Sequence, residues 1–233
     1  MSDLLQARLE AIEERIRSAC KKAGHDRTQV TLLAVTKGQS LETISHAHHL
    51  NLKEFGENRV QELLSKNSLL AEEEIFPEWH FLGHLQKNKV KDIVGIVDIL
   101  HTLDSINLVT ILDKRRKYLK EQGEMLTSVP PMRCFIQVNI TEENHKSGVL
   151  LNNFDQLLET ARKSDELSIV GLMAMAPYSK DVNKARPIFS KMRRLAEINK
   201  LPQLSMGMSQ DFEIAIEEGA TMIRLGTTLF GER

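Results

Sequence analysis

A lysine stands at the end of a short apolar run in LLAVTK, residues 32–37. A buried strand rarely ends on an ammonium group without an acidic neighbour, because a charge is costly to remove from water. One explanation is chemical: a lysine amine forms a Schiff base with a carbonyl compound, and burial lowers the lysine pKa and favours that reaction. The other explanation is that Lys37 extends from a strand end to solvent. The run by itself does not separate the two.

Two segments near the C-terminus have the features of an anion site. In MGMSQDFEIAIEEGA, residues 206–220, a predicted helix follows a strand end, with Ser209 as its expected N-cap. In RLGTT, residues 224–228, Gly226 permits close backbone approach and Thr227 adds a hydroxyl. Helix N-termini bind phosphate through their N–H groups and dipole. An anion site and an isolated lysine together indicate a phosphorylated carbonyl compound, and pyridoxal phosphate carries both groups.

The elements that position these residues alternate along the chain. Residues 3–23 place apolar side chains at spacings of three and four, which predicts a helix that ends at Gly24. From residue 32 the pattern predicts eight short apolar strands. Helices are predicted between them at roughly 41–50, 58–73, 86–95, 105–121, 153–164, 183–199 and 210–218. Such alternation indicates right-handed βαβ units and a parallel sheet.

Eight such units predict an α/β fold, a single (β/α)8 TIM-type barrel with an extra N-terminal helix. The alternative is an open doubly wound sheet, but the sequence has neither its usual Gly-x-Gly-x-x-Gly turn nor a GxxxxGK[ST] phosphate loop. No shift in composition divides the chain, so we predict one domain over 1–233, with the helix at 1–24 and the barrel at 30–233.

In a barrel of this type the functional groups lie at the carboxyl ends of the strands, and phosphate binds after strands seven and eight. Strand six is expected to end at the mouth with Met173 and Met175. We expect these two methionines and Met206 to serve barrel packing rather than cofactor binding. The polar and flexible residues expected at these strand ends are Lys37, Glu57, Asn58, Gly83, His84, His101, Asp104, Asn139, Met208, Ser209, Arg224, Gly226 and Thr227.

Composition excludes several classes of function. The chain has 31 Lys and Arg against 32 Asp and Glu, so it has no general attraction for nucleic acid or anionic membranes. The basic run at 114–120 fits a solvated helix face or a partner contact. Cys20 and Cys134 match no zinc spacing, and His80 and His84 have no third ligand, so no metal site is predicted. With no signal peptide or membrane span and two free thiols, we expect a cytoplasmic protein.

Seven sequence blocks, in a fixed order from about residue 30 to the C-terminus, carry a family resemblance. They are LLAVTK, FGENRVQE, WHFLGHLQKNKVK, LHTLDS, VNITEENHKSG, VGLMAMAP and LSMGMSQDFEIAIEEGATMIRLGTTLFGER. The chain resembles the pyridoxal phosphate homeostasis proteins of the YggS/PROSC type. One departure is TKGQS after the lysine, where members often have a proline-containing turn.

The resemblance implies a barrel like the N-terminal domain of alanine racemase, without the second domain of that enzyme. It implies that pyridoxal 5'-phosphate is held as a Schiff base and that members keep the free cofactor low without established turnover. It assigns seven residues to the cofactor: Lys37 to the Schiff base, Asn58 and Met208 to the ring, Ser209, Gly226 and Thr227 to the phosphate, and Arg224 to the ring nitrogen. An arginine cannot accept a proton, so a ring nitrogen facing it stays unprotonated and stabilises carbanions poorly.

Two other classes of function compete with this prediction. A pyridoxal phosphate-dependent amino-acid racemase or decarboxylase would need a second base, and alanine racemase uses a tyrosine; Tyr118 lies mid-helix, which leaves Tyr178. The third class is a barrel that binds another phosphorylated metabolite. Without the resemblance, we would expect Arg224 to be a structural arginine paired with an acid such as Glu57. We predict a non-catalytic binding protein for vitamin B6 homeostasis. Apo-enzymes that receive the cofactor are candidate partners, and both a monomer and a weak dimer fit the sequence.

Overall fold

Eight parallel strands close into a barrel in the computed structural model, which describes residues 2–142 and 147–231. Each strand pairs with its neighbour in chain order, and β1 also pairs with β8. The strands are β1 Thr31–Val35, β2 Glu54–Glu57, β3 Glu78–Phe81, β4 Ile99–Leu103, β5 Met132–Gln137, β6 Leu167–Met173, β7 Gln203–Ser205 and β8 Met222–Leu225. This confirms the predicted (β/α)8 barrel and excludes the open sheet. Residues 143–146 of the VNITEENHKSG block and 232–233 of the last block lie outside the described residues.

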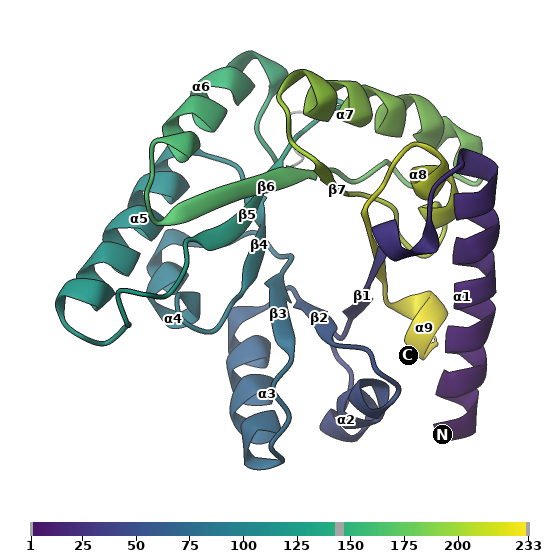
Figure 1. Ribbon diagram of the computed structural model, residues 1–233, viewed down its shortest axis with the longest axis horizontal. Helices are drawn as coiled ribbons and strands as arrows, with labels where there is room; N and C mark the ends of the chain where they lie inside the picture. The colour runs from purple at the N-terminus through teal and green to yellow at the C-terminus, as the bar shows by residue number, and fades with distance from the viewer. Residues whose placement is uncertain (1, 143–146, 232–233) are drawn as a thin grey trace.

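The helices surround the barrel, as Figure 1 shows. They are α1 Ser2–Ala23, α2 Leu41–His49, α3 Val60–Glu72, α4 Val90–Ile93, α5 Ile106–Glu121, α6 Leu151–Arg162, α7 Arg186–Ile198, α8 Phe212–Glu217 and α9 Thr227–Phe230. The predicted helix at 86–95 is only partly present, as a 3-10 turn at Lys87–Lys89 followed by α4. The helix ends before Gly95, whose φ of 130° is incompatible with helical backbone.

The N-terminal helix α1 packs against α8 and α9, the two helices that follow β7 and β8 (Figure 1). Its buried face carries Ile12 and Ile16, four residues apart, as expected for an amphipathic helix. Arg8 donates to the carbonyl of Phe230 at 2.8 Å, and Arg15 pairs with Glu213 at 2.6 Å. The helix therefore supports from outside the same loops that the sequence marked as an anion site.

The barrel interior is filled by side chains that alternate along the strands. An apolar cluster of Leu33, Ile99, Phe135, Met173 and Met222 occupies part of it. Polar side chains occupy the rest, and they are fully or almost fully buried: His80, His101, Ser205 and Arg224. None of the described helices is long and apolar enough to cross a membrane.

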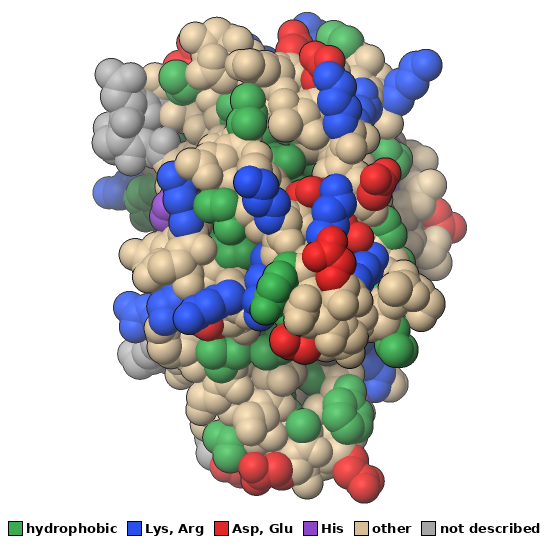
Figure 2. Space-filling view, turned by 90° about the vertical axis from the view of Figure 1, so that its left-hand side faces the viewer, with side chains coloured by type: hydrophobic (Ala, Val, Ile, Leu, Met, Phe, Trp, Pro, Cys, Tyr) green, Lys and Arg blue, Asp and Glu red, His purple; other side chains and the backbone are tan. Residues whose placement is uncertain are grey.

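The basic run at 114–120 lies on α5, and its charges are largely paired within the molecule. Arg116 and Lys120 both bind Glu166, at 3.2 Å and 2.8 Å, and Lys117 binds Asp113 at 3.0 Å. Figure 2 views this side of the molecule and shows acidic and apolar side chains interspersed among the basic ones. This surface therefore fits a solvated helix face.

Candidate functional site

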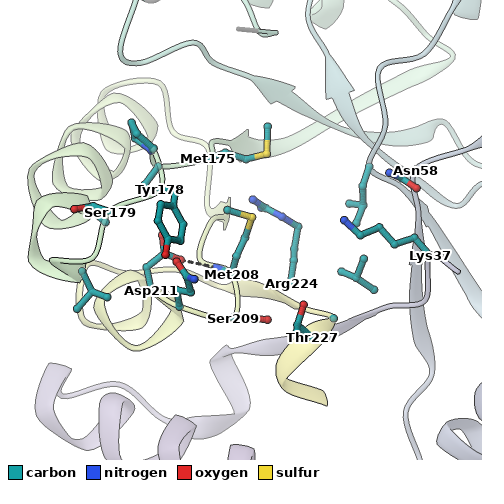
Figure 3. A pocket seen from close by; sticks show the side chains of 18 of the residues that line it. Lys37, Asn58, Met175, Tyr178, Ser179, Met208, Ser209, Asp211, Arg224 and Thr227 are labelled. Atoms are coloured by element: carbon teal, nitrogen blue, oxygen red, sulfur yellow. Dashed lines mark hydrogen bonds between the residues drawn. The ribbon is translucent and has the colours of Figure 1, made fainter. Parts of the chain in front are cut away.

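A pocket of about 590 Å³ opens at the end of the barrel where the strands terminate, which we call the mouth. Its volume lies within the roughly 300–1,000 Å³ range of small-molecule sites. The pocket is lined by all seven residues that the resemblance assigned to a cofactor: Lys37, Asn58, Met208, Ser209, Arg224, Gly226 and Thr227. In Figure 3, Lys37 and Asn58 lie on one side of the pocket, Met208 and Ser209 lie on the other, and Arg224 lies between them.

Lys37 follows β1 by two residues and extends into the pocket (Figure 3). Its side chain is exposed, so it extends from the strand end into the cavity and is not buried. The exposure follows from its position, since the preceding Thr36 is fully buried at the strand end and the chain turns at Gly38, where φ is 68°. A short buried strand thus delivers an amine to an open cavity.

A buried cluster of charged side chains, which we call the clamp, holds the chain on both sides of Lys37. The ammonium of Lys66 on α3 donates to the carbonyl of Thr36 and to carboxylate oxygens of Glu57 and Glu62, each at 2.7 Å. The hydroxyl of Thr36 donates to Glu57 at 2.6 Å, and the backbone N–H of Gly38 donates to Glu62. The clamp therefore fixes the residues before and after Lys37.

Glu57 is fully buried at the end of β2, and burial raises the pKa of its carboxyl group even though Lys66 and Thr36 act in the opposite direction. Only one of its carboxylate oxygens is satisfied, because Oε2 has no hydrogen-bond partner. Since Glu57 binds Lys66, the alternative pairing of Arg224 with Glu57 is wrong. Removing Lys66 would leave a buried carboxylate without its counter-ion.

Asn58 is exposed in the pocket directly after β2, and its backbone is packed against the end of β3. A Cβ atom at Gly83 would lie 2.1 Å from the carbonyl oxygen of Asn58, so only glycine permits this approach. His84 is exposed outside the pocket lining, 3.5 Å from Asp104. His101 was expected at the mouth, which is wrong: β4 continues to Leu103 and places His101 inside the barrel.

The loop after β7 folds back on itself before α8 begins. Gly207 has a φ of 94°, and a Cβ atom there would lie 2.6 Å from Ala215, so this turn requires glycine. The N–H of Met208 donates to the carboxylate of Asp211 at 2.7 Å, and the carbonyl of Met208 accepts from Asp211 and Phe212. Asp211, rather than Ser209, is the N-cap of α8. The predicted cap is wrong because the turn ends two residues later than the sequence suggested.

Ser209 instead joins the loop after β7 to the loop after β8. Its hydroxyl accepts from the N–H of Thr228, and its carbonyl accepts from the Thr228 hydroxyl, both at 3.3 Å. The hydrogen of the Ser209 hydroxyl is left to donate into the pocket. Gly226 precedes α9, and Thr227 is exposed beside it. The two loops contain no lysine, but they offer hydroxyl and backbone N–H donors, which suit the oxygens of a phosphate group.

Arg224 lies at the end of β8 and is almost fully buried. Its guanidinium donates to the carbonyl and hydroxyl of Ser205, at 2.6 Å and 2.7 Å, and to the carbonyl of Ala174 at 3.0 Å. Burial lowers its pKa to about 10, with Asp211 acting in the opposite direction. Arg224 is therefore a cation at neutral pH and can only donate to a ligand in the pocket.

Part of the apolar wall was expected and part was not. Met173 and Met175 were expected at the end of strand six, and both line the pocket there. Val35 and Leu82 were not expected, and they line it as well. Met173 also packs in the barrel interior as expected, but Met175 is 47% exposed at the mouth, so its expected packing role is wrong. The signal for the two methionines was the alternation in MAM, because residues two apart at a strand end face the same side.

The two tyrosines lie in different surroundings. Tyr178 lines the pocket near Met208 in Figure 3 and is 76% exposed. Tyr118 lies on α5, outside the pocket lining, with the guanidinium of Arg115 at 5.3 Å from its ring centre. Within residues 2–142 and 147–231, no three His, Cys, Asp or Glu side chains are grouped so that they could hold a metal ion.

The relatives described here share one name, and their alignments cover almost all of the chain. The protein from Aquifex aeolicus named pyridoxal phosphate homeostasis protein is 41% identical, over 97% of each chain. The protein of the same name from Pseudomonas aeruginosa is 36% identical, over 95% of this chain and 93% of that one. These matches are far above the similarity at which a shared fold alone would be inferred.

Two further comparisons concern the fold. The family profile of the alanine racemase N-terminal domain matches residues 7–233. PipY of Synechococcus elongatus, whose structure was solved with PLP bound, is 32% identical and superposes with a TM-score of 0.78, over 94% of this chain and all of PipY. The closed barrel, the near-complete alignments and the profile together show that the chain belongs to the pyridoxal phosphate homeostasis protein family, on the alanine racemase N-terminal domain fold.

Proposed function

We propose that this protein binds pyridoxal 5'-phosphate in the mouth pocket through a Schiff base with Lys37 and serves vitamin B6 homeostasis in the cytoplasm. The observation that carries the proposal is the meeting of all seven predicted residues in one cavity, with a lysine on one wall and paired anion-binding loops on the other. The names of the relatives and the PLP bound to PipY support the same ligand. The free cysteines, Cys20 and Cys134, fit a reducing compartment.

Each wall of the pocket has its own task in this proposal. Lys37 supplies the amine, and the clamp keeps it directed into the cavity. Ser209, Gly226 and Thr227 donate to the phosphate, while Arg224 donates to the ring nitrogen. Bound pyridoxal phosphate supplies an aldehyde that condenses with a primary amine and a ring that withdraws electrons. The residues present fit these groups by charge and by donor type.

Two features support binding and release over catalysis. Arg224 is a permanent donor, so it favours an unprotonated ring nitrogen, which is a weaker electron sink. Tyr178, the one tyrosine in the pocket lining, is 76% exposed, whereas a second base for racemisation has to be held close to the reacting carbon. An exposed lysine at an open mouth also suits exchange of the cofactor with apo-enzymes, which we propose as its recipients.

Visible absorption spectroscopy tests the proposal. Pyridoxal phosphate added to the purified protein should produce a yellow band that is absent from Lys37→Ala. Lys180→Ala is the matched control, because Lys180 lies near the same mouth but outside the pocket lining. A band of equal strength in Lys37→Ala would overturn the anchor, and a colourless wild-type protein would overturn the ligand. Turnover of L- or D-alanine by the coloured protein, lost in Tyr178→Phe, would establish the enzyme alternative instead.

A further inference from the structure

A chain of buried polar side chains crosses the barrel interior from Arg224 to the opposite end. Arg224 donates to the hydroxyl of Ser205 at 2.7 Å, and that hydroxyl lies 2.9 Å from Nδ1 of His101. Nε2 of His101 lies 2.8 Å from Nδ1 of His80. Nε2 of His80 lies 3.1 Å from a carboxylate oxygen of Glu54, although off the direction of a hydrogen bond. We call Ser205, His101 and His80 the relay.

The relay is completely buried, whereas Glu54 beyond its far end is partly exposed to solvent. Ser205, His101 and His80 are all fully buried. Glu54 begins β2 at the amino end of the barrel, and its side chain is 26% exposed. The relay therefore connects the pocket to the opposite end of the barrel through a region that is otherwise apolar, beside Phe135, whose ring lies 4.6 Å from that of His101. Buried polar groups are usually satisfied by hydrogen bonds, and every relay nitrogen and oxygen has a partner except Nε2 of His80, which faces Glu54.

The hydrogen positions in the relay follow from Arg224, because a guanidinium only donates. The Ser205 hydroxyl accepts from Arg224, and we assign its single hydrogen to its other neighbour, Nδ1 of His101, since no other acceptor in the described part of the chain is in reach. Burial and the nearby Arg224 and His80 hold the pKa of His101 well below its usual value, so its ring is neutral. With Nδ1 accepting, the ring hydrogen lies on Nε2 and is donated to His80. The hydrogen of His80 then lies on Nε2, toward Glu54.

This order gives every dipole of the relay the same direction. The hydroxyl oxygen of Ser205 faces Arg224, and each imidazole turns its lone pair toward Arg224 and its N–H away. Aligned dipoles in a low-dielectric interior strengthen one another and stabilise the cation that their negative ends face. Among the described residues, Arg224 has no direct ion pair, so the relay contributes to the stability of its buried charge.

We propose that Ser205, His101 and His80 are positioning residues that hold Arg224 as an oriented, permanently charged donor at the floor of the pocket. The consequence for the ring nitrogen rests on the proposed function, whereas the relay itself is a property of the protein without its ligand. The relay determines which hydrogens of the Arg224 guanidinium bind inside the barrel and which remain available to a ligand in the pocket. It also explains why histidines occupy a barrel interior that lacks a metal cluster among the described residues.

The first test needs no ligand. Long-range ¹H–¹⁵N NMR spectra of the protein labelled in its histidine rings report the tautomer of each ring. We expect the ring hydrogen on Nε2, with Nδ1 as acceptor, in both His101 and His80, assigned from the signals lost in single variants. A hydrogen on Nδ1 of His101 would reverse the relay and overturn the inference, whatever the protein binds. Failure to bind pyridoxal phosphate would overturn the proposed function and leave this result standing.

The second test uses pyridoxal phosphate labelled with ¹⁵N in its ring. Ser205→Ala and His101→Phe should each shift the ring-nitrogen resonance and weaken binding by about 2- to 10-fold, the usual effect of one hydrogen bond. His84→Phe is the control, because His84 is exposed outside the pocket lining. Ser205→Ala removes a single oxygen, so it keeps the test decisive if the larger substitution prevents folding. An unshifted resonance in Ser205→Ala would contradict the positioning role.

Discussion

The two walls of the pocket are built in different ways. The wall that carries Lys37 is held by the clamp, in which Lys66 binds Glu57 and Glu62 within a mostly buried cluster. The opposite wall is held by neutral groups: Ser209 and Thr228 exchange hydrogen bonds between two loops. Charged groups thus fix the backbone around Lys37, whereas neutral groups join the two loops to which we assign the phosphate.

The difference has a physical reason. Lys66 holds the backbone next to Lys37, and Glu57 and Glu62 neutralise its charge at 2.7 Å. The paired Lys66 therefore adds little repulsion against the ammonium form of Lys37. On the opposite wall, a structural carboxylate would repel a phosphate. Asp211 lies there, but its carboxylate is turned to the N–H of Met208, and burial raises its pKa. The clamp should therefore dominate stability, and the neutral wall should dominate affinity.

The largest expected effect is on stability, in Lys66→Met. This change leaves the fully buried Glu57 without its counter-ion, which costs about 3–5 kcal/mol of unfolding free energy for buried pairs. Urea denaturation measures the loss. Lys163→Met is the matched control, because it breaks an exposed pair with Glu159, and its effect should be small. Equal losses in the two variants would show that the clamp is not a buried ionic cluster.

The next effect is on affinity, in Ser209→Ala. The hydroxyl of Ser209 is proposed to donate to a charged phosphate, and a hydrogen bond of this type corresponds to roughly 10- to 100-fold in binding. Titration with pyridoxal phosphate gives the ratio, and urea denaturation should show only a minor change in stability. Ser179→Ala, in the same pocket lining, provides the comparison and should bind almost as the wild type does. Strong destabilisation without a loss of affinity would contradict the division between the walls.

A smaller effect is a pH dependence of the clamp. In Lys66→Met, Glu57 holds its proton more tightly when folded than when unfolded, because burial raises its pKa above the usual 4.5. The folded chain then binds more protons, so its unfolding free energy should fall as pH rises above that value, by at most about 1.4 kcal/mol per pH unit. Adding Glu57→Gln to Lys66→Met should remove this slope. If the slope persists in the variant that carries both changes, the pH dependence arises from groups other than Glu57.

The smallest effect concerns Tyr178. Because its side chain is 76% exposed at the mouth, Tyr178→Phe should change affinity for pyridoxal phosphate by less than about twofold. The same titration measures it. A loss comparable to that of Ser209→Ala would mean that Tyr178 closes over the ligand, which would bring the racemase alternative forward.

The fold could be predicted because its signal is local. Eight apolar runs between amphipathic stretches identify the strands and helices, and β1 to β8 appear in the predicted number and alternate with helices as predicted. The position of Lys37 and Arg224 in one pocket could also be predicted from the sequence, since strand ends in a parallel barrel converge. Pattern and topology were enough for both.

The supporting contacts could not be predicted, because they join residues that are distant in sequence. His101 and Ser205 are 104 positions apart, and Lys66 reaches Thr36 across 30 positions. Ser209 was expected to cap α8, but the turn at Gly207 and Asp211 redirected its hydroxyl to Thr228. Periodicity identifies which side chains are buried, but it does not identify their partners.

Borohydride reduction followed by peptide mass spectrometry tests most directly whether Lys37 carries the cofactor, as we propose. The protein is loaded with pyridoxal phosphate, reduced and digested, and every lysine-containing peptide is compared with that of an unreduced sample. We expect the reduced adduct on the peptide that contains Lys37, and no adduct on the corresponding peptide of Lys37→Ala. An adduct that is spread over exposed lysines such as Lys180, or an adduct that persists in Lys37→Ala, would contradict the assignment of Lys37.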